Sequence, residues 1–327
     1  MHCTGLEKLP CQPNNSANRF RDNRHSIMKK RHFLYLAGFA AQTVLLGRKK
    51  PLVGTIVLTD RCNLDCKHCA VHNLECKMYS YPTIRGEMES LYRDGVRILF
   101  FCGGETFLWE SDGKRIHDLV REAKEIGFYI VNVVTNGTLE MDIEGVDVMF
   151  LSLDGQRETH NRIRGDVFDL VMSRIAATQG QNFCVFMAIN NENYTEIESM
   201  CRFVREHPKL RSISFNLHMP YPGTEHLSLS PEQRIESVNT IRAMIDRGYP
   251  VFNLKSSLDV YLENKWKRPC RQCVVSENGK RFQCGRCIEI DGLCEQCGYL
   301  FAAEFSRLFS GHPSAIADVV KTYLRFI

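Results

Sequence analysis

The chain has 327 residues, of which 44% are hydrophobic and 24% are charged, and its formal net charge is +4. These fractions are ordinary for a folded protein and exclude a globally disordered chain. The 42 basic residues barely outnumber the 38 acidic ones, which excludes the strongly basic surface typical of nucleic-acid binding. The longest apolar run covers 14 residues, 33–46, and is shorter than the roughly 20 of an ordinary membrane span.

Fifteen cysteines are the most informative feature of the composition. Their share of the chain is below the roughly 8–10% that is typical of a disulfide scaffold, and nine of them fall into tight groups. Such groups are typical of metal ligands in a reducing compartment. No secretory signal is recognisable, so we expect a cytoplasmic protein. Six cysteines are expected to be plain thiols: Cys3, Cys11, Cys76, Cys102, Cys184 and Cys201.

The first 51 residues divide into two segments of different composition. Residues 1–27 are polar and aperiodic, which predicts a disordered leader or an upstream start before Met28. Residues 28–51 predict a helix with six basic and no acidic residues around its apolar run. This helix could lie on an anionic membrane surface, giving peripheral membrane contact. Alternatively, it packs against the core with solvated basic ends.

Residues 52–250 alternate between buried strands and helices. The aliphatic run 53–59 is typical of a strand buried on both faces. Further strands are predicted at 96–101, 129–135, 148–153, 184–189 and 211–217. Helices are predicted at 82–93, 114–126, 167–178, 194–205 and 231–247. The expected fold is α/β, a partial (β/α)6 barrel of parallel strands, with its chemistry at the carboxyl ends of the strands.

Three cysteines follow the first strand directly. Cys62, Cys66 and Cys69 have the spacing Cys-x3-Cys-x2-Cys, with no fourth cysteine at ferredoxin spacing. Thiolates suit iron–sulfur clusters and zinc alike. A four-iron cluster would keep one iron open, whereas zinc would recruit a fourth ligand such as His72 or Cys76.

Polar residues also end the next three strands. Each is a weak signal alone, because Asn-Gly and Asp-Gly are ordinary turns. Together they place polar groups at four successive strand ends, beside an incomplete three-cysteine site. They are Gly103, Gly104 and Glu105 after the second strand, Asn136 after the third, and Ser152 and Asp154 at the fourth.

With these motifs, residues 52–250 resemble the radical S-adenosylmethionine (SAM) enzymes. The resemblance implies a [4Fe–4S] cluster on Cys62, Cys66 and Cys69, whose open iron binds the amine and carboxylate of S-adenosylmethionine. It implies that Gly103, Gly104 and Glu105 contact the methionine amino group, and that Asn136, Ser152 and Asp154 lie near the ribose. Arg164 is the expected partner of the methionine carboxylate, the alternative being a solvated arginine at a helix start. His68 stands where the family often has an aromatic residue, and its imidazole could still stack on adenine.

The same resemblance implies a reaction. An electron from a low-potential donor of ferredoxin or flavodoxin type cleaves S-adenosylmethionine to a 5′-deoxyadenosyl radical. This radical then abstracts hydrogen from a substrate or adds to it. A protein that binds zinc for interaction only is the non-enzymatic alternative, and the Gly103–Glu105 motif argues against it.

Residues 251–327 predict a cysteine-rich auxiliary metal region followed by two helices. Its cysteines are Cys270, Cys273, Cys284, Cys287, Cys294 and Cys297. Asn278-Gly279 predicts a two-residue hairpin that brings the first two cysteine pairs together. Four thiolates could fill one zinc site, or all six could hold one auxiliary iron–sulfur cluster and part of a second.

The substrate is open at this point. The tail differs from the seven-cysteine extension of peptide-modifying radical SAM enzymes, which lowers the expectation of a peptide. The segment 46–52 and the late Cys-x-x-Cys-Gly-Tyr resemble the adenosylhopane synthase branch, which implies a membrane lipid as substrate. A peptide or another metabolite is the alternative.

Overall fold

The computed structural model describes residues 32, 34–43, 45–47, 50–70, 72–267 and 272–327. The chain forms two compact units, residues 1–47 and 48–327. In the first unit, residues 34–43 are helical as predicted, and the rings of Tyr35 and Phe39 stack with centroids 6.5 Å apart. The predicted leader, 1–27, lies outside the described residues. Across the described part of the chain, every helix is too short or too polar to cross a membrane.

The second unit is built on an eight-stranded sheet with the order β10-β9-β1-β2-β5-β6-β7-β8. All neighbouring strands are parallel except β9 and β10. The six predicted strands are confirmed within a few residues, whereas the extension of the sheet by β9 and β10 was not predicted. The bounds are β1 Val53–Val57, β2 Ile98–Cys102, β5 Ile130–Thr135, β6 Val148–Ser152, β7 Phe183–Ile189, β8 Leu210–Leu217, β9 Cys273–Glu277 and β10 Lys280–Gln283.

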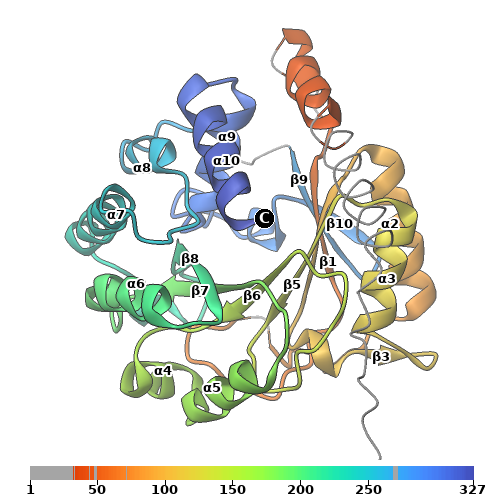
Figure 1. Cartoon of the computed structure of the whole chain (residues 1–327), viewed down its shortest axis with the longest axis horizontal. Helices are drawn as coiled ribbons and strands as arrows, with labels where there is room; N and C mark the ends of the chain where they lie inside the picture. Colours follow the sequence, from red (N-terminus) through yellow and green to blue (C-terminus); the bar gives the residue numbers. More distant parts are fainter. Residues whose placement is uncertain (1–31, 33, 44, 48–49, 71, 268–271) are drawn as a thin grey trace, which may run out of the picture. The chain divides into compact units, whose positions relative to one another are not determined.

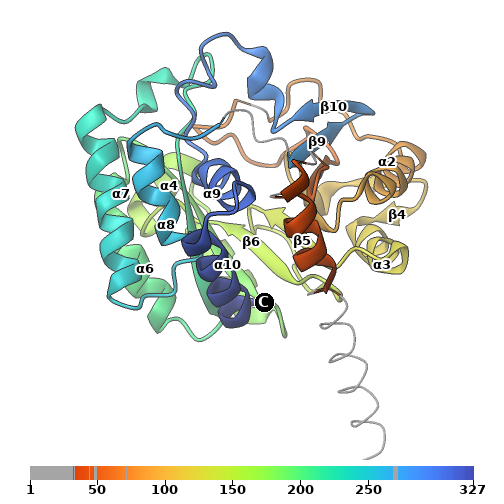
Figure 2. The same cartoon turned by 90° about the horizontal axis from the view of Figure 1, so that it is seen from above.

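Helices cover the outer face of this curved sheet (Figures 1 and 2). They are α2 Tyr81–Asp94, α3 Ile116–Ile126, α4 Arg157–Arg164, α5 Phe168–Ala177, α6 Ile197–Glu206 and α7 Pro231–Asp246. Two begin at a serine N-cap with a proline in the first turn: Ser80 precedes Tyr81 and Pro82 in α2, and Ser230 precedes Pro231 in α7. The sequence did not predict α4. It also placed residues 114–115 in a helix, whereas Lys114–Arg115 form β4, paired with β3 (Glu110–Ser111).

Aromatic side chains fill the interior toward the amino ends of the strands. Phe150 of β6 lies 5.5–5.9 Å, between ring centroids, from Phe100, Phe186 and Phe252. Phe326, at the end of α10 (Pro313–Phe326), packs on Phe252 at 5.8 Å.

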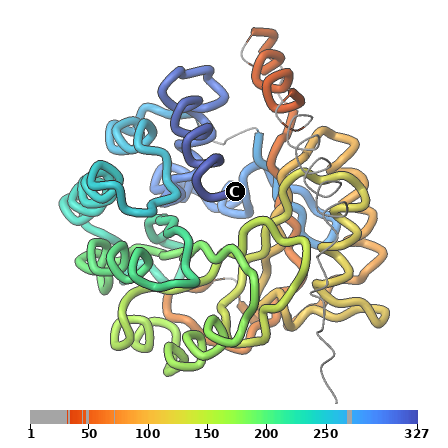
Figure 3. Tube along the Cα trace, in the orientation of Figure 1, coloured from red at the N-terminus to blue at the C-terminus, as the bar shows by residue number. Residues whose placement is uncertain are grey.

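The cysteine-rich tail closes the gap between the first and last strands of the barrel (Figure 3). The predicted hairpin is confirmed, because Asn278 and Gly279 join β9 to β10 with φ of 49° and 77°. After β10 the chain crosses to β8, where the amide of Leu217 donates to the carbonyl of Gly298 at 2.8 Å. Helices α8 (Lys255–Leu262) and α9 (Leu300–Phe309) pack beside this crossing.

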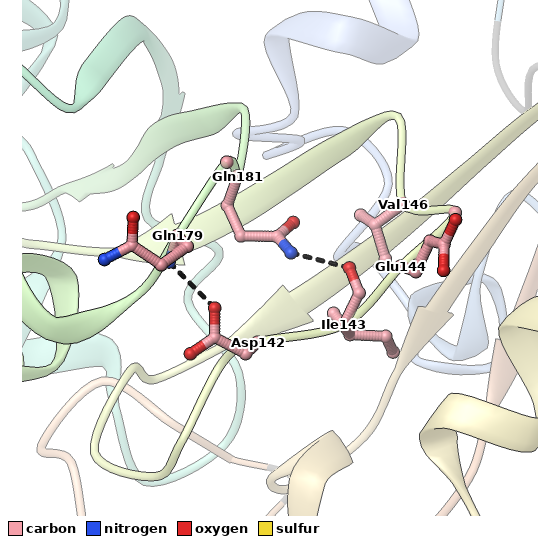
Figure 4. A pocket seen from close by; sticks show the side chains of 8 residues that line it. Asp142, Ile143, Glu144, Val146, Gln179 and Gln181 are labelled. Carbon is pink, nitrogen blue, oxygen red and sulfur yellow. Dashed lines mark hydrogen bonds between the residues drawn. The ribbon is translucent and has the colours of Figure 1, made fainter. Parts of the chain in front are cut away.

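A shallow polar hollow of about 450 Å³ lies between residues 142–146 and 179–181 (Figure 4). Its rim is tied by the amide of Gln179, which donates to Asp142 Oδ1 at 2.8 Å, and by the Gln181 side chain on the carbonyl of Ile143 at 2.6 Å. These loops precede β6 and β7. The hollow is therefore at the amino ends of the strands, at the opposite edge from the three clustered cysteines.

Candidate functional site

The three closely spaced cysteines lie in the loop after β1, and two polar side chains hold this loop. Both carboxylate oxygens of Asp60 accept backbone hydrogen bonds, from Glu75 and Lys77, at 2.5 Å each. The Asn73 side chain brackets Cys62, accepting from its amide at 2.8 Å and donating to its carbonyl at 3.1 Å. The sequence analysis missed both residues, because an Asp or Asn in a loop carries no distinctive signal.

The thiols of Cys62, Cys66 and Cys69 gather at one place. Burial, opposed by Arg164 and assisted by the charges of Asp154, Cys69 and Cys62, raises the pKa of Cys66 to about 11. Burial likewise raises the pKa of Cys62, with contributions from Glu105 and Cys69. Thiolates that repel one another across a short gap are stabilised by a bound cation. The donor set therefore fits an iron–sulfur cluster.

The geometry does not complete a zinc site around this loop. His72 pairs with Asp65 at 2.7 Å and contacts the carbonyl of Cys69, and Cys76 is exposed. Within the described ranges, no three His, Cys, Asp or Glu side chains converge tightly enough to hold one metal ion. In a four-iron cluster each thiolate binds a different iron, so its ligands stand farther apart than those of one zinc ion.

Gly103 and Gly104 pack against the cysteine loop. A Cβ on Gly103 would lie 2.4 Å from the carbonyl oxygen of Thr59, and a Cβ on Gly104 would lie 2.3 Å from that of Arg61. The amide of Gly104 donates to Thr59 at 2.7 Å, and that of Glu105 donates to Arg61 at 2.9 Å. The pair of glycines therefore allows the loops after β1 and β2 to touch backbone to backbone.

Glu105 is completely buried at the end of β2. Its carboxylate accepts from the Thr135 hydroxyl at 2.7 Å, the amide of Asn136 at 2.7 Å and the amide of Phe107 at 3.1 Å. Burial raises its pKa, although these hydrogen bonds oppose the shift. The Thr106 hydroxyl also reaches Oε1, at 3.5 Å, so the bonds concentrate on Oε1. Oε2 accepts only from Asn136 among the described residues, and a carboxylate oxygen has two acceptor positions, so Oε2 keeps room for one further donor.

Asn136 and Ser152 lie at the ends of the next two strands, Asn136 directly after β5 and Ser152 at the end of β6. The Asn136 side chain donates to Asn63 Oδ1 at 2.9 Å and reaches Cys62 Sγ at 3.8 Å. Ser152, the last residue of β6, is buried and stands in register with Phe186 on the inner face. Asn136 therefore contacts the cysteine loop, and Ser152 faces the barrel interior.

Asp154 and Arg164 form a buried ion pair beside Cys66. Arg164 Nε donates to Asp154 Oδ2 at 2.5 Å, and Nη1 lies 3.8 Å from Cys66 Sγ. The alternative of a solvated arginine at a helix start is wrong, because Arg164 ends α4 and is 9% exposed. Burial alone would raise the pKa of Asp154, but Arg164, His68 and the amide of Ala188 outweigh it and hold the pKa below its usual value.

His68 packs against this ion pair as a neutral imidazole. Its Nε2 lies 3.6 Å from Asp154 Oδ2 and 3.5 Å from Arg164 Nη2. Burial lowers its pKa to about 4, and Arg164 adds to that shift. Its Nδ1 is buried with no hydrogen-bond partner among the described residues. An unsatisfied buried nitrogen next to the cysteines fits a polar ligand bound at this place.

The tail cysteines approach one another, except that Cys270 lies outside the described residues. The amide of Cys284 donates to the carbonyl of Cys273 at 3.1 Å, which confirms that the hairpin joins these pairs. Burial raises the pKa of Cys287 to about 12, and the nearby charges of Cys284 and Cys294 contribute. Cys297 follows Cys294 in a turn closed by a 3.3 Å hydrogen bond. The soft donors of Cys284, Cys287 and Cys294 thus lie near one another, although among the described residues no three of them converge on a single metal ion.

Comparison with known proteins agrees with this geometry. The Radical SAM superfamily model matches residues 56–204. The Fe-coproporphyrin III synthase of Methanosarcina barkeri is 28% identical over 270 residues, covering 75% of this chain and 63% of that protein. The subtilosin biosynthesis protein AlbA of Bacillus subtilis is 26% identical over 172 residues, covering 48% and 37%. The chain thus spans less than two thirds of the length of these relatives.

Solved structures share the fold at low sequence identity. Streptococcus suis SuiB bound to its precursor peptide SuiA aligns with a TM-score of 0.57 and 13% identity, over 95% of this chain and 75% of that one. The structure of anSMEcpe with bound AdoMet and a peptide aligns with a TM-score of 0.54 and 16% identity, over 84% of each chain. The expected α/β fold with a mostly parallel sheet is confirmed.

Proposed function

Because the chain belongs to the radical SAM superfamily, we propose that it is an enzyme that cleaves S-adenosylmethionine at a [4Fe–4S] cluster held by Cys62, Cys66 and Cys69. One observation carries this proposal: the thiols of Cys62, Cys66 and Cys69 meet beside the buried Glu105 and the Asp154–Arg164 pair. When bound, the cluster and S-adenosylmethionine supply the one-electron chemistry that yields a 5′-deoxyadenosyl radical.

The chain's own residues bind and orient the methionine end. Glu105 has one remaining acceptor position, which suits the ammonium group. Arg164 has donors beyond the one it gives to Asp154, and its position at Cys66 suits the carboxylate. Gly103 and Gly104 act by bringing the second loop against the cysteine loop.

The adenosine end would lie toward the carboxyl ends of β5 and β6. Asn136 and Ser152 are the proposed ribose contacts, and both face the cysteine loop or the interior. Asp154 is the third residue expected near the ribose, but its Oδ1 accepts a hydrogen bond from the Ala188 amide and its Oδ2 accepts one from Arg164. We therefore assign Asp154 to holding Arg164 in place. His68 keeps the proposed place against adenine, and its free Nδ1 adds a hydrogen-bonding atom there.

For the substrate we propose a small molecule or a peptide. The 5′-deoxyadenosyl radical either abstracts a hydrogen atom from this substrate or adds to it. The relatives named above carry a porphyrin and a bacteriocin in their names, and the aligned structures hold peptides. The lipid expected from the adenosylhopane-type likeness finds no support among them. The tail cysteines supply an auxiliary iron–sulfur cluster or zinc, and a ferredoxin- or flavodoxin-type donor supplies the electron.

Peripheral membrane contact rests on the charge pattern of residues 28–50 alone. If the helix binds a membrane surface, the protein co-sediments with anionic vesicles and is released as salt rises, since each basic residue contributes on the order of 1 kcal/mol. If the protein binds neutral vesicles as well as anionic ones, or binds neither, the result favours the alternative that this helix packs against the core.

The cleavage itself is tested with reduced, anaerobically reconstituted protein. We expect at least four irons per chain and conversion of S-adenosylmethionine to 5′-deoxyadenosine. Cys66→Ala should abolish the conversion and remove the iron of this cluster, apart from any metal held by the tail, because two thiolates cannot hold the cluster. Cys76→Ala is the matched control, since Cys76 lies in the same loop but is exposed. Unchanged turnover in the Cys66 variant would contradict the assignment.

A further inference from the structure

A second ion pair, half-buried, lies where the tail meets the barrel. Glu277 is the last residue of β9 and stands in register with Val57, the last residue of β1. Its carboxylate pairs with Arg286, and the two side chains are 11% and 28% exposed. The pair therefore lies at the carboxyl ends of the strands, the edge that also carries Cys62, Cys66 and Cys69.

Arg286 leads directly into a tail cysteine. It begins the short helix η4 (Arg286–Glu289), and the next residue is Cys287, which is 4% exposed. Besides local turns, such as the amide of Ile288 on the carbonyl of Gly285 at 3.2 Å, η4 is tied to β10 by the exposed Lys280–Glu289 pair, and Cys287 packs in the main hydrophobic core. The Glu277–Arg286 pair is therefore a partly shielded polar link between β9 and the helix that carries Cys287.

Glu277 also reaches the loop of the first cysteine set. The Tyr79 hydroxyl donates to Glu277 Oε1 at 3.1 Å. Tyr79 is itself fixed, because its amide donates to Leu58 at 3.1 Å and its carbonyl accepts from the Trp109 indole at 2.8 Å. One carboxylate thus links the loop after β1 to the loop that carries Cys287.

A second ion pair, between β10 and η4, is much more exposed to solvent than the Glu277–Arg286 pair. Lys280 and Glu289 pair at 2.7 Å with side chains 61% and 52% exposed. Exposed pairs of this kind contribute little. The half-buried Glu277–Arg286 pair, by contrast, loses more solvation, and the best-attested use of a pair withdrawn from water is to specify one arrangement of the groups around it.

We propose that Glu277 is a positioning residue that fixes Cys287 in the metal-binding arrangement of the tail by holding Arg286. Tyr79 holds the carboxylate and so ties this arrangement to the first cysteine loop. The inference rests on the proposed tail metal site. It assigns no chemistry to Glu277 itself, which acts only through Arg286.

The test uses the full chain with Cys62, Cys66 and Cys69 all changed to Ala, so that only the tail can hold metal. The protein is reconstituted anaerobically with ferrous iron and sulfide, or with Zn²⁺ alone, and metal per chain and absorption spectrum are measured. In this background Glu277→Gln should weaken metal retention against a chelator by about tenfold or more, the range seen when groups that orient metal ligands are removed. Glu289→Gln is the matched control and should leave retention unchanged.

Glu277→Gln leaves the Arg286 charge without its partner, so folding must be checked by circular dichroism. The double variant Glu277→Gln, Arg286→Met removes both charges and should fold, yet still lose retention because the tether is absent. If either folded variant retains metal like Glu289→Gln, the positioning role is overturned. If the background protein itself retains no metal, the tail site fails and this inference falls with it, a result that is distinguishable from the first.

Discussion

Arg164 and Asp154 approach from different elements, the end of α4 and the loop after β6, and meet at 2.5 Å with side chains 10% and 0% exposed. The guanidinium also lies 3.8 Å from Cys66 Sγ. Asp154 is anchored in turn, since its amide donates to His160 Nδ1 at 3.3 Å and its carbonyl accepts from Asn193 at 2.9 Å. A positive charge is thereby fixed against the cysteines.

Asp154→Asn should therefore destabilise the protein strongly. The substitution keeps the shape but leaves Arg164 buried without a counter-charge, a change that costs about 3–5 kcal/mol in buried pairs. Urea unfolding of the metal-free protein measures it. Asp169→Asn is the control, because Asp169 pairs with Arg157 in the open, with side chains 60–63% exposed, and such pairs contribute about 0–1 kcal/mol. Equal effects of the two variants would contradict the buried-pair argument.

The pKa of Asp154 also predicts acid sensitivity. Its pKa in the folded protein is depressed, so the pair stabilises the fold above the unfolded pKa of about 3.9, and this stabilisation is lost as the pH falls through the folded value. Asp154→Asn should lack this part of the acid transition, which unfolding curves between neutral pH and pH 3 would reveal.

Gly104→Ala should displace the cysteine loop. The new Cβ would meet backbone atoms of Arg61 at 2.3 and 2.5 Å, and backbone cannot rotate away as a flexible side chain does. We expect iron incorporation to fall severalfold and the unfolding temperature to drop. Gly86→Ala provides the comparison, since nothing lies within 4 Å of its Cβ position in α2 and the change should stabilise the helix by about 0.5–1 kcal/mol. Normal iron content in Gly104→Ala would show that the loops can separate without consequence.

Glu304→Gln should stabilise the protein at alkaline pH. Glu304 of α9 is buried, and burial raises its pKa to about 7, while its hydrogen bonds from Asn253 and Leu254 oppose the shift. Since the folded pKa lies above the unfolded value of about 4.3, wild-type stability falls as the pH rises from about 4.3 to 7. The loss is on the order of 3 kcal/mol. Urea unfolding at pH 5 and pH 8 should show this slope in the wild type and a smaller one in the variant.

The two cysteine sets should bind metal independently. The triple change of Cys62, Cys66 and Cys69 to Ala should leave tightly bound metal, with absorbance near 400 nm if it is iron (roughly, for sulfur-to-iron transitions) and about one colourless ion per chain if it is zinc. Changing Cys273 and Cys284 together should remove that metal and loosen the tail, because binding there is coupled to folding. A triple variant that folds without metal would mean that the tail is not a site of its own.

The barrel and its cysteine loop could be predicted because their signals are local. The six strands are short, mostly apolar runs, most completely in β6, where all five residues are apolar or small and all are buried. The spacing of Cys62, Cys66 and Cys69 marks a metal loop by itself. Arg164 could be named as a candidate from the sequence, but its burial could not be predicted. Most residues of α4 are polar, and Arg164 is buried because it packs against Asp154 and Cys66.

The place of the tail in the sheet could not be predicted. In β9 only Val274 and Val275 resemble a buried strand, and the partner that completes the pairing, β1, lies far back in the chain. For the same reason Glu277 and Arg286 look like ordinary surface charges in a hairpin. Their burial arises from non-local pairing, which a short window of residues does not contain.

The pairing of β9 with β1 has a consequence for how the protein is made. Cys273 follows its partner Val53 by 220 residues, so at about 5–20 residues per second a ribosome takes roughly 10–40 s to deliver the strand that covers this edge. Until then the outer edge of β1 carries unpaired backbone groups, the kind of edge that recruits other chains. Nascent protein should depend on chaperones during this interval, and a chain ending before residue 272 should aggregate even though all six strands of the barrel are present.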